Sequence, residues 1–172
     1  MTDKNKIENA GLVLAAPFLP HLFRNLGLLA GMRFADEAAQ ARAVYILQYM
    51  ADGLPFVTGN LQLNMLLCGW LDNRALPPAP ALSEAERRQA DQAVEALRSH
   101  WTALGDMSLD TLRSQFFRRD ARIEMGLEPK IIIRAQPHDA PLKDLPWIIA
   151  VTRTPWSEKI HVDWESRETP QR

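Results

Sequence analysis

The sequence contains a single cysteine, which limits the covalent and metal chemistry available to the protein. Cys68 is the only cysteine among 172 residues, so the chain can form neither an internal disulfide nor a cysteine-rich zinc site. This composition fits a reducing compartment. Because Cys68 lies in an apolar stretch without a neighbouring His or Lys, we interpret it as a packing residue and not as an activated nucleophile.

A large excess of charge of either sign is also missing. The 20 basic and 21 acidic side chains give a net charge of −1, which leaves no basic field to attract nucleic acid phosphates. The apolar run from Ala10 to Leu19 is too short to cross a bilayer, and Pro17 interrupts it. We therefore expect neither a nucleic acid nor a membrane as a partner.

Motifs of known catalytic chemistry are absent as well. The eight glycines are scattered and build no phosphate-binding loop, and the sequence has neither a nucleophile elbow nor a metalloprotease helix motif. His161 and Asp163 would project from one face of a strand, but no third metal ligand accompanies them. The carboxylates between residues 106 and 124 each have a local explanation as a turn, helix start or strand face. We expect no catalytic residue, no cofactor and no metal.

Hydrophobic patterning predicts an α+β fold formed by a single domain, residues 1–172. Hydrophobic residues make up 47% of the chain and charged residues 24%, as in ordinary globular proteins. Apolar residues recur at helical spacing up to residue 119 and mostly at alternate positions after residue 120. We expect the helical part, 7–119, to pack with a small C-terminal antiparallel sheet, 120–165. Prolines mark residues 74–81 as a semi-rigid connector within the helical part.

About five helices are expected in the N-terminal part. Their approximate ranges are 19–26, 35–51, 60–68, 83–104 and 108–119. The fourth is the clearest, because Ser83 and Glu86 form a capping box at its start. The second is apolar almost all round and should therefore be central. Residues 7–16 fit either a helix or a strand.

Three or four short strands are expected in the C-terminal part. Ile123, Met125 and Leu127 alternate with polar residues, and the turn at residues 128–129 leads into the apolar residues 131–133. Residues 147–151 have the pattern of a strand buried on both faces. Residues 160–165 have that of a half-exposed strand.

The distribution of tryptophan suggests where a partner could bind. Three of the five tryptophans follow residue 146, and rigid amphipathic indoles are enriched at protein interfaces. We assign Trp101 and Trp147 to the core. For Trp156 and Trp164 an interface and a core position are equally favoured, because tryptophan is seldom fully buried.

The apolar N-terminal stretch suggests a second exposed surface. Its length could exceed what one small core covers and so leave a sticky patch. The candidate interface residues from both regions are Trp156, Trp164, Pro155, Leu12, Leu14 and Phe18.

Several stretches, in unbroken order, resemble the C-terminal module of tape measure proteins from phage-tail-like contractile injection systems. Residues 8–23 (ENAGLVLAAPFLPHLF) resemble its opening, residues 41–49 (ARAVYILQY) its Arg-Ala-Val helix, and residues 63–69 (LNMLLCG) a further segment. Shorter similarities follow at residues 100–101, 112–113, 117–119, 145–147, 155–156 and 162–164. The likeness extends over residues 7–165.

The resemblance implies a structural role without a catalytic residue. Such proteins set tail-tube length from inside the lumen and assemble with the spike and baseplate. The implied partners are spike, baseplate or tube subunits, a homo-oligomer such as a trimer is compatible with it, and the implied location is the bacterial cytoplasm during assembly, with or without retention in the particle. Family members carry a long variable region before the module, whereas about six residues precede it here. We therefore expect a terminal anchor, a capping or baseplate component, or a ruler for a very short tube.

Two other functions stay open from the sequence. An adaptor or chaperone that holds a cargo effector before loading would use the apolar N-terminal stretch. A small hydrolase would use His100 or His161 together with a nearby carboxylate.

Overall fold

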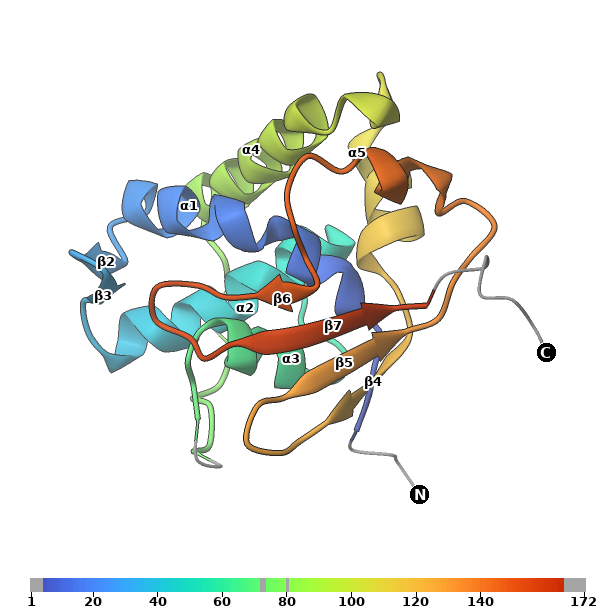
Figure 1. The fold of residues 1–172 in the computed structure, drawn as a ribbon. Helices are drawn as coiled ribbons and strands as arrows, with labels where there is room; N and C mark the ends of the chain where they lie inside the picture. The colour runs from blue at the N-terminus through green and yellow to red at the C-terminus, as the bar shows by residue number, and fades with distance from the viewer. Residues whose placement is uncertain (1–4, 72–73, 80, 166–172) are drawn as a thin grey trace.

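The computed structural model describes residues 5–71, 74–79 and 81–165 and confirms the α+β class (Figure 1). Five α-helices, mostly in the N-terminal part, accompany a five-stranded sheet and a separate two-stranded hairpin. The α-helices are α1 (Leu19–Asn25), α2 (Glu37–Asp52), α3 (Gln62–Leu67), α4 (Glu84–His100) and α5 (Leu109–Leu112). Short helical segments of other types are η1 (Ala10–Phe18), η2 (Thr102–Leu104), η3 (Arg113–Phe117) and η4 (Ala140–Asp144).

The large sheet is mixed, so the prediction of a wholly antiparallel sheet is wrong. Its strands follow the order β1 (Lys6–Ile7), β4 (Ala121–Glu124), β5 (Lys130–Ile133), β7 (Ile160–Trp164) and β6 (Val151–Thr152). β5 and β7 are parallel, whereas the other pairs are antiparallel. Residues 134–159 form the long crossover that a parallel pair requires. The second sheet is the hairpin of β2 (Leu29–Ala30) and β3 (Arg33–Phe34).

The prediction of a doubly buried strand at residues 147–151 is also wrong. Only Val151 and Thr152 form a strand, and Ile148 is 83% exposed. An apolar run bounded by prolines does not show whether the run pairs with other strands. Here most of the run belongs to the crossover and is not part of the sheet. Met125 and Leu127 likewise lie in the exposed turn after β4 and not in the strand.

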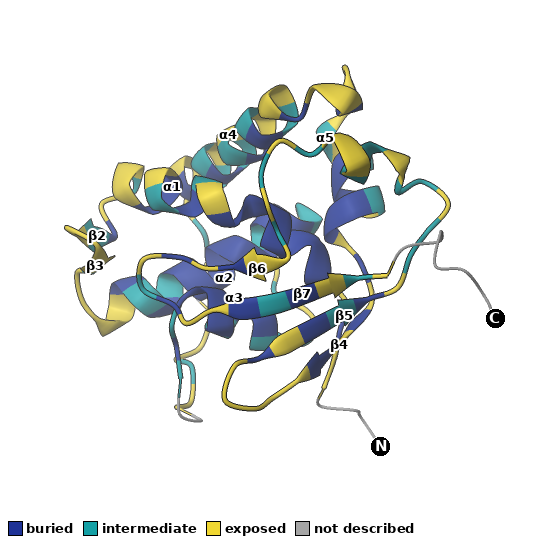
Figure 2. Cartoon of the chain, viewed as in Figure 1, coloured by how far each residue is buried: buried dark blue, intermediate teal, exposed yellow. Residues whose placement is uncertain are grey.

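The sheet covers one side of the helical part. In Figure 1 the strands lie in front of α2 and α3, while α1 and α4 run along the upper side. Alternate strand residues such as Ile123, Ile131 and Ile160 are buried, and their neighbours are mostly exposed (Figure 2). One face of the sheet therefore closes the core.

The central elements of the core are α2 and η1. As the sequence predicts, α2 is buried nearly all round, and it packs against α4, α3, η1 and η3. Of residues 7–16, which fitted either a helix or a strand, Ile7 ends strand β1 and residues 10–16 belong to the 3₁₀ segment η1, where all seven are buried. A Cβ atom at Gly11 would lie 1.6 Å from the Phe116 carbonyl oxygen, so the contact between η1 and η3 requires a glycine.

We predict that Gly11→Ala destabilises the protein by about 3 kcal/mol or more, because the added methyl group meets backbone and cannot be accommodated by a rotamer change. Urea unfolding followed by circular dichroism measures this loss. Gly126→Ala is the matched control, since its Cβ would have an ordinary contact of 3.9 Å with the Glu128 carbonyl oxygen. Equal stability of the two variants would contradict the close packing of η1 against η3.

Candidate functional site

His100 and His161, which sequence analysis considered for chemistry, each contact another residue of the chain. His161 binds Glu128, and Nδ1 of His100 lies 2.8 Å from the Ala96 carbonyl oxygen one helical turn earlier. Among residues 5–71, 74–79 and 81–165, no group of three or more His, Cys, Asp or Glu side chains could hold a metal ion. Within the same ranges no helix is both long and apolar enough to cross a membrane.

The predicted apolar surface at the N-terminus does not exist. Leu12 and Leu14 are 0% exposed, because η1 packs against α4, α3 and η3. Phe18 is half-buried and packs edge-on against Trp147, with 5.2 Å between ring centroids, and against His100 at 5.5 Å. The expectation of an exposed patch is therefore wrong for Leu12 and Leu14, whereas the half-buried Phe18 stays a candidate.

Trp156 and Pro155 lie where the C-terminal crossover meets the end of α3. The half-buried indole of Trp156 donates a hydrogen bond of 2.8 Å to the Leu67 carbonyl oxygen, and its ring centroid lies 4.9 Å from that of Phe34. Thr154 donates to the same carbonyl at 3.1 Å. Pro155 is exposed, and with Trp156 it lines a pocket of 610 Å³. Trp156 thus fastens the crossover to α3 and presents only part of its ring.

Trp164 belongs to a buried ionic cluster at the end of β7. Its indole N–H donates to Oδ2 of Asp139 at 3.1 Å, and the Arg119 guanidinium lies 5.0 Å from the ring centroid. Arg119 donates to both carboxylate oxygens of Asp139, at 2.7 and 2.9 Å. Burial alone would raise the pKa of Asp139, but the hydrogen bonds from Arg119, from the Gln136 backbone and from Trp164 outweigh it and lower the pKa.

The five tryptophans share one structural role that sequence analysis did not identify. Every indole N–H donates to another part of the chain, including the Arg74 carbonyl for Trp70, the Pro141 carbonyl for Trp101 and the Leu14 carbonyl for Trp147. The available signal was general, because a buried tryptophan needs an acceptor. Which acceptor it finds depends on the tertiary structure.

A buried network of three amide side chains was missed entirely by sequence analysis. Gln48 donates to Asp52 and to the Thr58 carbonyl, so its Oε1 faces inward. Asn64 donates to a backbone carbonyl of α2, which turns its Oδ1 inward as well. Asn9 donates to both oxygens, at 2.9 and 2.7 Å. A signal existed, because Asn64 is a polar residue within the otherwise apolar residues 63–68.

The geometry of this network fixes the orientation of the Asn9 amide. Since two acceptors face it, Nδ2 must point toward Gln48 and Asn64, and Oδ1 must point away from them. Oδ1 is buried and has no hydrogen-bond partner among the described residues. Such an unpaired acceptor costs about 1–3 kcal/mol unless a donor from outside reaches it.

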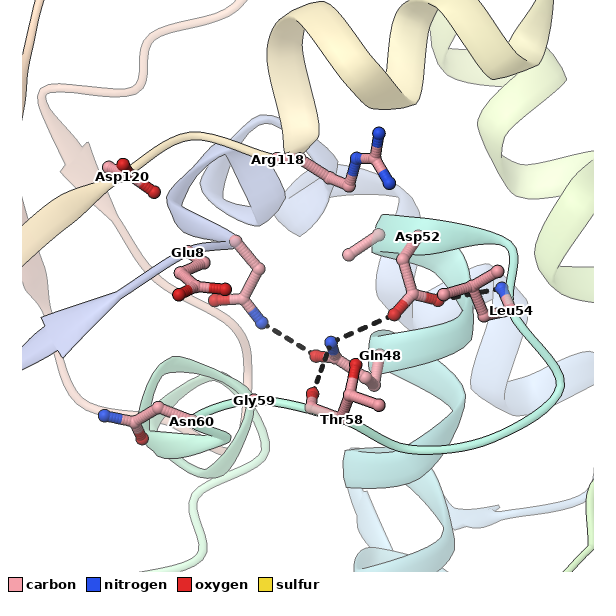
Figure 3. A pocket seen from close by; sticks show the side chains of 11 residues that line it. Glu8, Gln48, Asp52, Leu54, Thr58, Gly59, Asn60, Arg118 and Asp120 are labelled. Atoms are coloured by element: carbon pink, nitrogen blue, oxygen red, sulfur yellow. Dashed lines mark hydrogen bonds between the residues drawn. The ribbon is translucent and has the colours of Figure 1, made fainter. Parts of the chain in front are cut away.

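Asn9 also lines a pocket at the junction of four segments (Figure 3). The pocket has a volume of 290 Å³, and its charged lining side chains are Glu8, Asp52, Arg118 and Asp120. Asp52 receives hydrogen bonds from Gln48 and from the Leu54 backbone, but burial outweighs them and raises the pKa of its carboxyl group. The pocket therefore presents hydrogen-bond acceptors and negative charge, which suit a positively charged hydrogen-bond donor.

The first three stretches that carry the family resemblance meet in this network. Asn9 belongs to residues 8–23, Gln48 to residues 41–49 and Asn64 to residues 63–69. A family model described as contractile injection system tape measure protein matches residues 2–164 of the chain. Neither the curated proteins nor the solved structures contain a match.

We predict that Asp139→Asn lowers the free energy of unfolding at about pH 7 by about 3 kcal/mol, because it leaves Arg119 buried without its counter-charge. The lowered pKa of Asp139 means that its carboxylate stabilises the fold above the ordinary value of 3.8, and that this contribution disappears as the pH falls through the lower folded-state pKa. The difference between wild type and variant should therefore shrink on acidification. Urea unfolding across this range measures it.

The exposed carboxylate Asp106 provides the matched control. Asp106→Asn removes the same charge outside the cluster and should unfold like the wild type at every pH. A difference between wild type and Asp139→Asn that stays constant down to about pH 2 would contradict the ionic account.

Proposed function

Because the chain belongs to the family of contractile injection system tape measure proteins, we propose that it is a non-catalytic assembly component of a contractile injection particle. It acts by binding tube, spike or baseplate subunits. It is assembled in the bacterial cytoplasm. Mass spectrometry of purified particles tests whether the protein is retained in the finished particle. A trimeric state is part of the same proposal and is tested by light scattering.

One observation carries the non-catalytic role: several polar side chains within the resembling stretches form hydrogen bonds that hold the fold together. Asn64 binds Asn9 and a backbone carbonyl, and the indoles of Trp101, Trp147 and Trp156 each bind a carbonyl. Arg113 donates to the Met50 carbonyl and to Asp91. Side chains used in this way stabilise a shape and are not free for chemistry, which supports a protein that functions through its surface.

The shape of the described residues supports an anchoring role more than that of a ruler. The longest helix is α4 with 17 residues, which corresponds to about 26 Å. The helices pack against one another instead of forming a rod (Figure 1). This part of the protein is suited to hold one end of an assembly or to join subunits at the spike or baseplate.

The proposed contact surface includes apolar side chains that the fold leaves exposed. Leu127 in the turn between β4 and β5 is 101% exposed, and Ile148 near β6 is 83% exposed. The parts of Trp156 and Trp164 that line pockets, together with Pro155, remain further candidates. Leu12 and Leu14 are not candidates, because they are fully buried.

The adaptor alternative loses the feature that motivated it, since the apolar N-terminal stretch is covered by helices. A pull-down from the native host separates it from the assembly role. Recovery of tube, spike or baseplate subunits without a cargo protein supports assembly, whereas recovery of a cargo effector alone supports the adaptor.

We predict that deletion of the gene abolishes normal particles or alters their length, because subunits that depend on this anchor lack their binding site. Electron microscopy of purified particles measures both length and abundance. Particles of normal length and number would rule the assembly role out.

Complementation locates the contact surface. A double variant, Leu127→Ser with Ile148→Ser, should fold but restore particles poorly, because it removes apolar contact area without touching the core. Met32→Ser is the matched control, since Met32 is an exposed apolar residue of the separate β2–β3 turn. Full restoration by the double variant would exclude these two side chains from the interface.

A further inference from the structure

Asn9 lines a pocket and has an unused acceptor, its buried Oδ1. Asn9 is 4% exposed, and its amide cannot turn to pair Oδ1 without giving up both hydrogen bonds of Nδ2. No donor from the described residues reaches Oδ1. A buried acceptor held in this way is complementary to a hydrogen-bond donor that enters from outside the chain.

The charges of the pocket select the kind of donor. Glu8, Asp52 and Asp120 contribute three carboxylates, and Arg118 contributes the single guanidinium of the lining. Figure 3 shows Glu8, Asp52 and Arg118 projecting from three different segments around the hollow. In the described part of the chain, neither the Glu8 nor the Asp120 side chain has a hydrogen bond or an ion pair. The pocket therefore favours a positively charged donor over a neutral or negative one.

The spacing of the carboxylates argues against a metal ion as the occupant. Within residues 5–71, 74–79 and 81–165 no three acidic, His or Cys side chains converge closely enough to hold a metal ion. The acceptors of this pocket are spread around its lining. Such an arrangement suits a cation with several separate N–H donors better than a metal ion. A guanidinium has five N–H donors in a planar fork and keeps its charge at all physiological pH values.

We propose that this pocket receives an arginine side chain from a partner subunit, whose guanidinium donates to Oδ1 of Asn9 and to the carboxylates of Glu8 and Asp120. The identity of the partner as a particle subunit rests on the proposed function, whereas the chemistry of the pocket does not. The burial that raises the pKa of Asp52 adds to the effect, because an incoming cation compensates a carboxylate that is poorly solvated.

The test uses a small probe, N-acetyl-arginine methylamide, added to the full chain and followed by NMR of the side-chain amide groups. We expect the Asn9 amide signals to shift and saturate in the millimolar range, as is usual for a single-residue ligand. The citrulline analogue has the same shape without the charge. It should bind about fivefold more weakly or not at all.

Two charge-removing variants test the assignment of the residues. Glu8→Gln and Asp120→Asn should each weaken binding of the arginine probe by about fivefold, because each removes one carboxylate acceptor. Neither side chain is used within the described fold, so both variants should keep the wild-type backbone spectrum. Asp106→Asn, which removes an exposed charge outside the pocket, should bind as tightly as the wild type.

Three outcomes would overturn the proposal. They are the absence of a saturable shift at Asn9, equal binding of the arginine and citrulline probes, and saturation by calcium chloride without a response to the arginine probe. Unchanged affinity in both Glu8→Gln and Asp120→Asn would do the same. The probe experiment needs no particles, so a negative result would refute the proposed arginine pocket without affecting the proposed assembly role. Conversely, normal particles after gene deletion would refute the assembly role without affecting the result of the probe experiment.

Discussion

Buried backbone carbonyl groups that need donors from distant side chains are the constraint on which this fold depends. The last carbonyls of a helix have no partner within it, and leaving one buried and unpaired costs about 1–3 kcal/mol. The Leu67 carbonyl at the end of α3 receives Trp156 and Thr154, and the Met50 carbonyl near the end of α2 receives Arg113. The short helices therefore depend on segments far along the chain, and residues of the helical part and of the sheet share one hydrophobic core.

The same dependence explains what the family signature encodes. Asparagine, arginine and tryptophan side chains such as Asn9, Arg113 and Trp156 donate hydrogen bonds between segments, so they specify a shape. Exposed apolar residues such as Leu127 and Ile148 do not contribute to the packed core. The pocket beside Asn9 is the exception, because there an internal network ends with an acceptor that the described residues do not satisfy. The structural role of Asn9 and the binding role that we propose for it therefore involve the same side chain.

Sequence patterns correctly predicted the elements that are specified by residues close together in the sequence. The capping box of Ser83 and Glu86 does begin α4, and the all-round apolar pattern of α2 does place it in the core. Patterns failed where the outcome depends on a neighbour that is distant in sequence. The apolar run near Ile148 could have entered the sheet as a central strand, but the crossover leaves most of it outside the strands and puts the short β6 at the edge. The candidate site was missed for a similar reason, since Asn9, Gln48 and Asn64 are meaningful only together.

The sequence by itself determined the α+β class, the approximate places of the five helices and the membership of the family, because hydrophobic period, caps and motif order are properties of neighbouring residues. The tertiary structure alone decided that β5 and β7 run parallel, that Leu12 and Leu14 are buried, and that the Asn9 amide has an unused oxygen. The physical reason is that burial and hydrogen-bond partners depend on which segments meet in space. Side chains separated by 39 and 55 positions in the sequence fix the orientation of one amide.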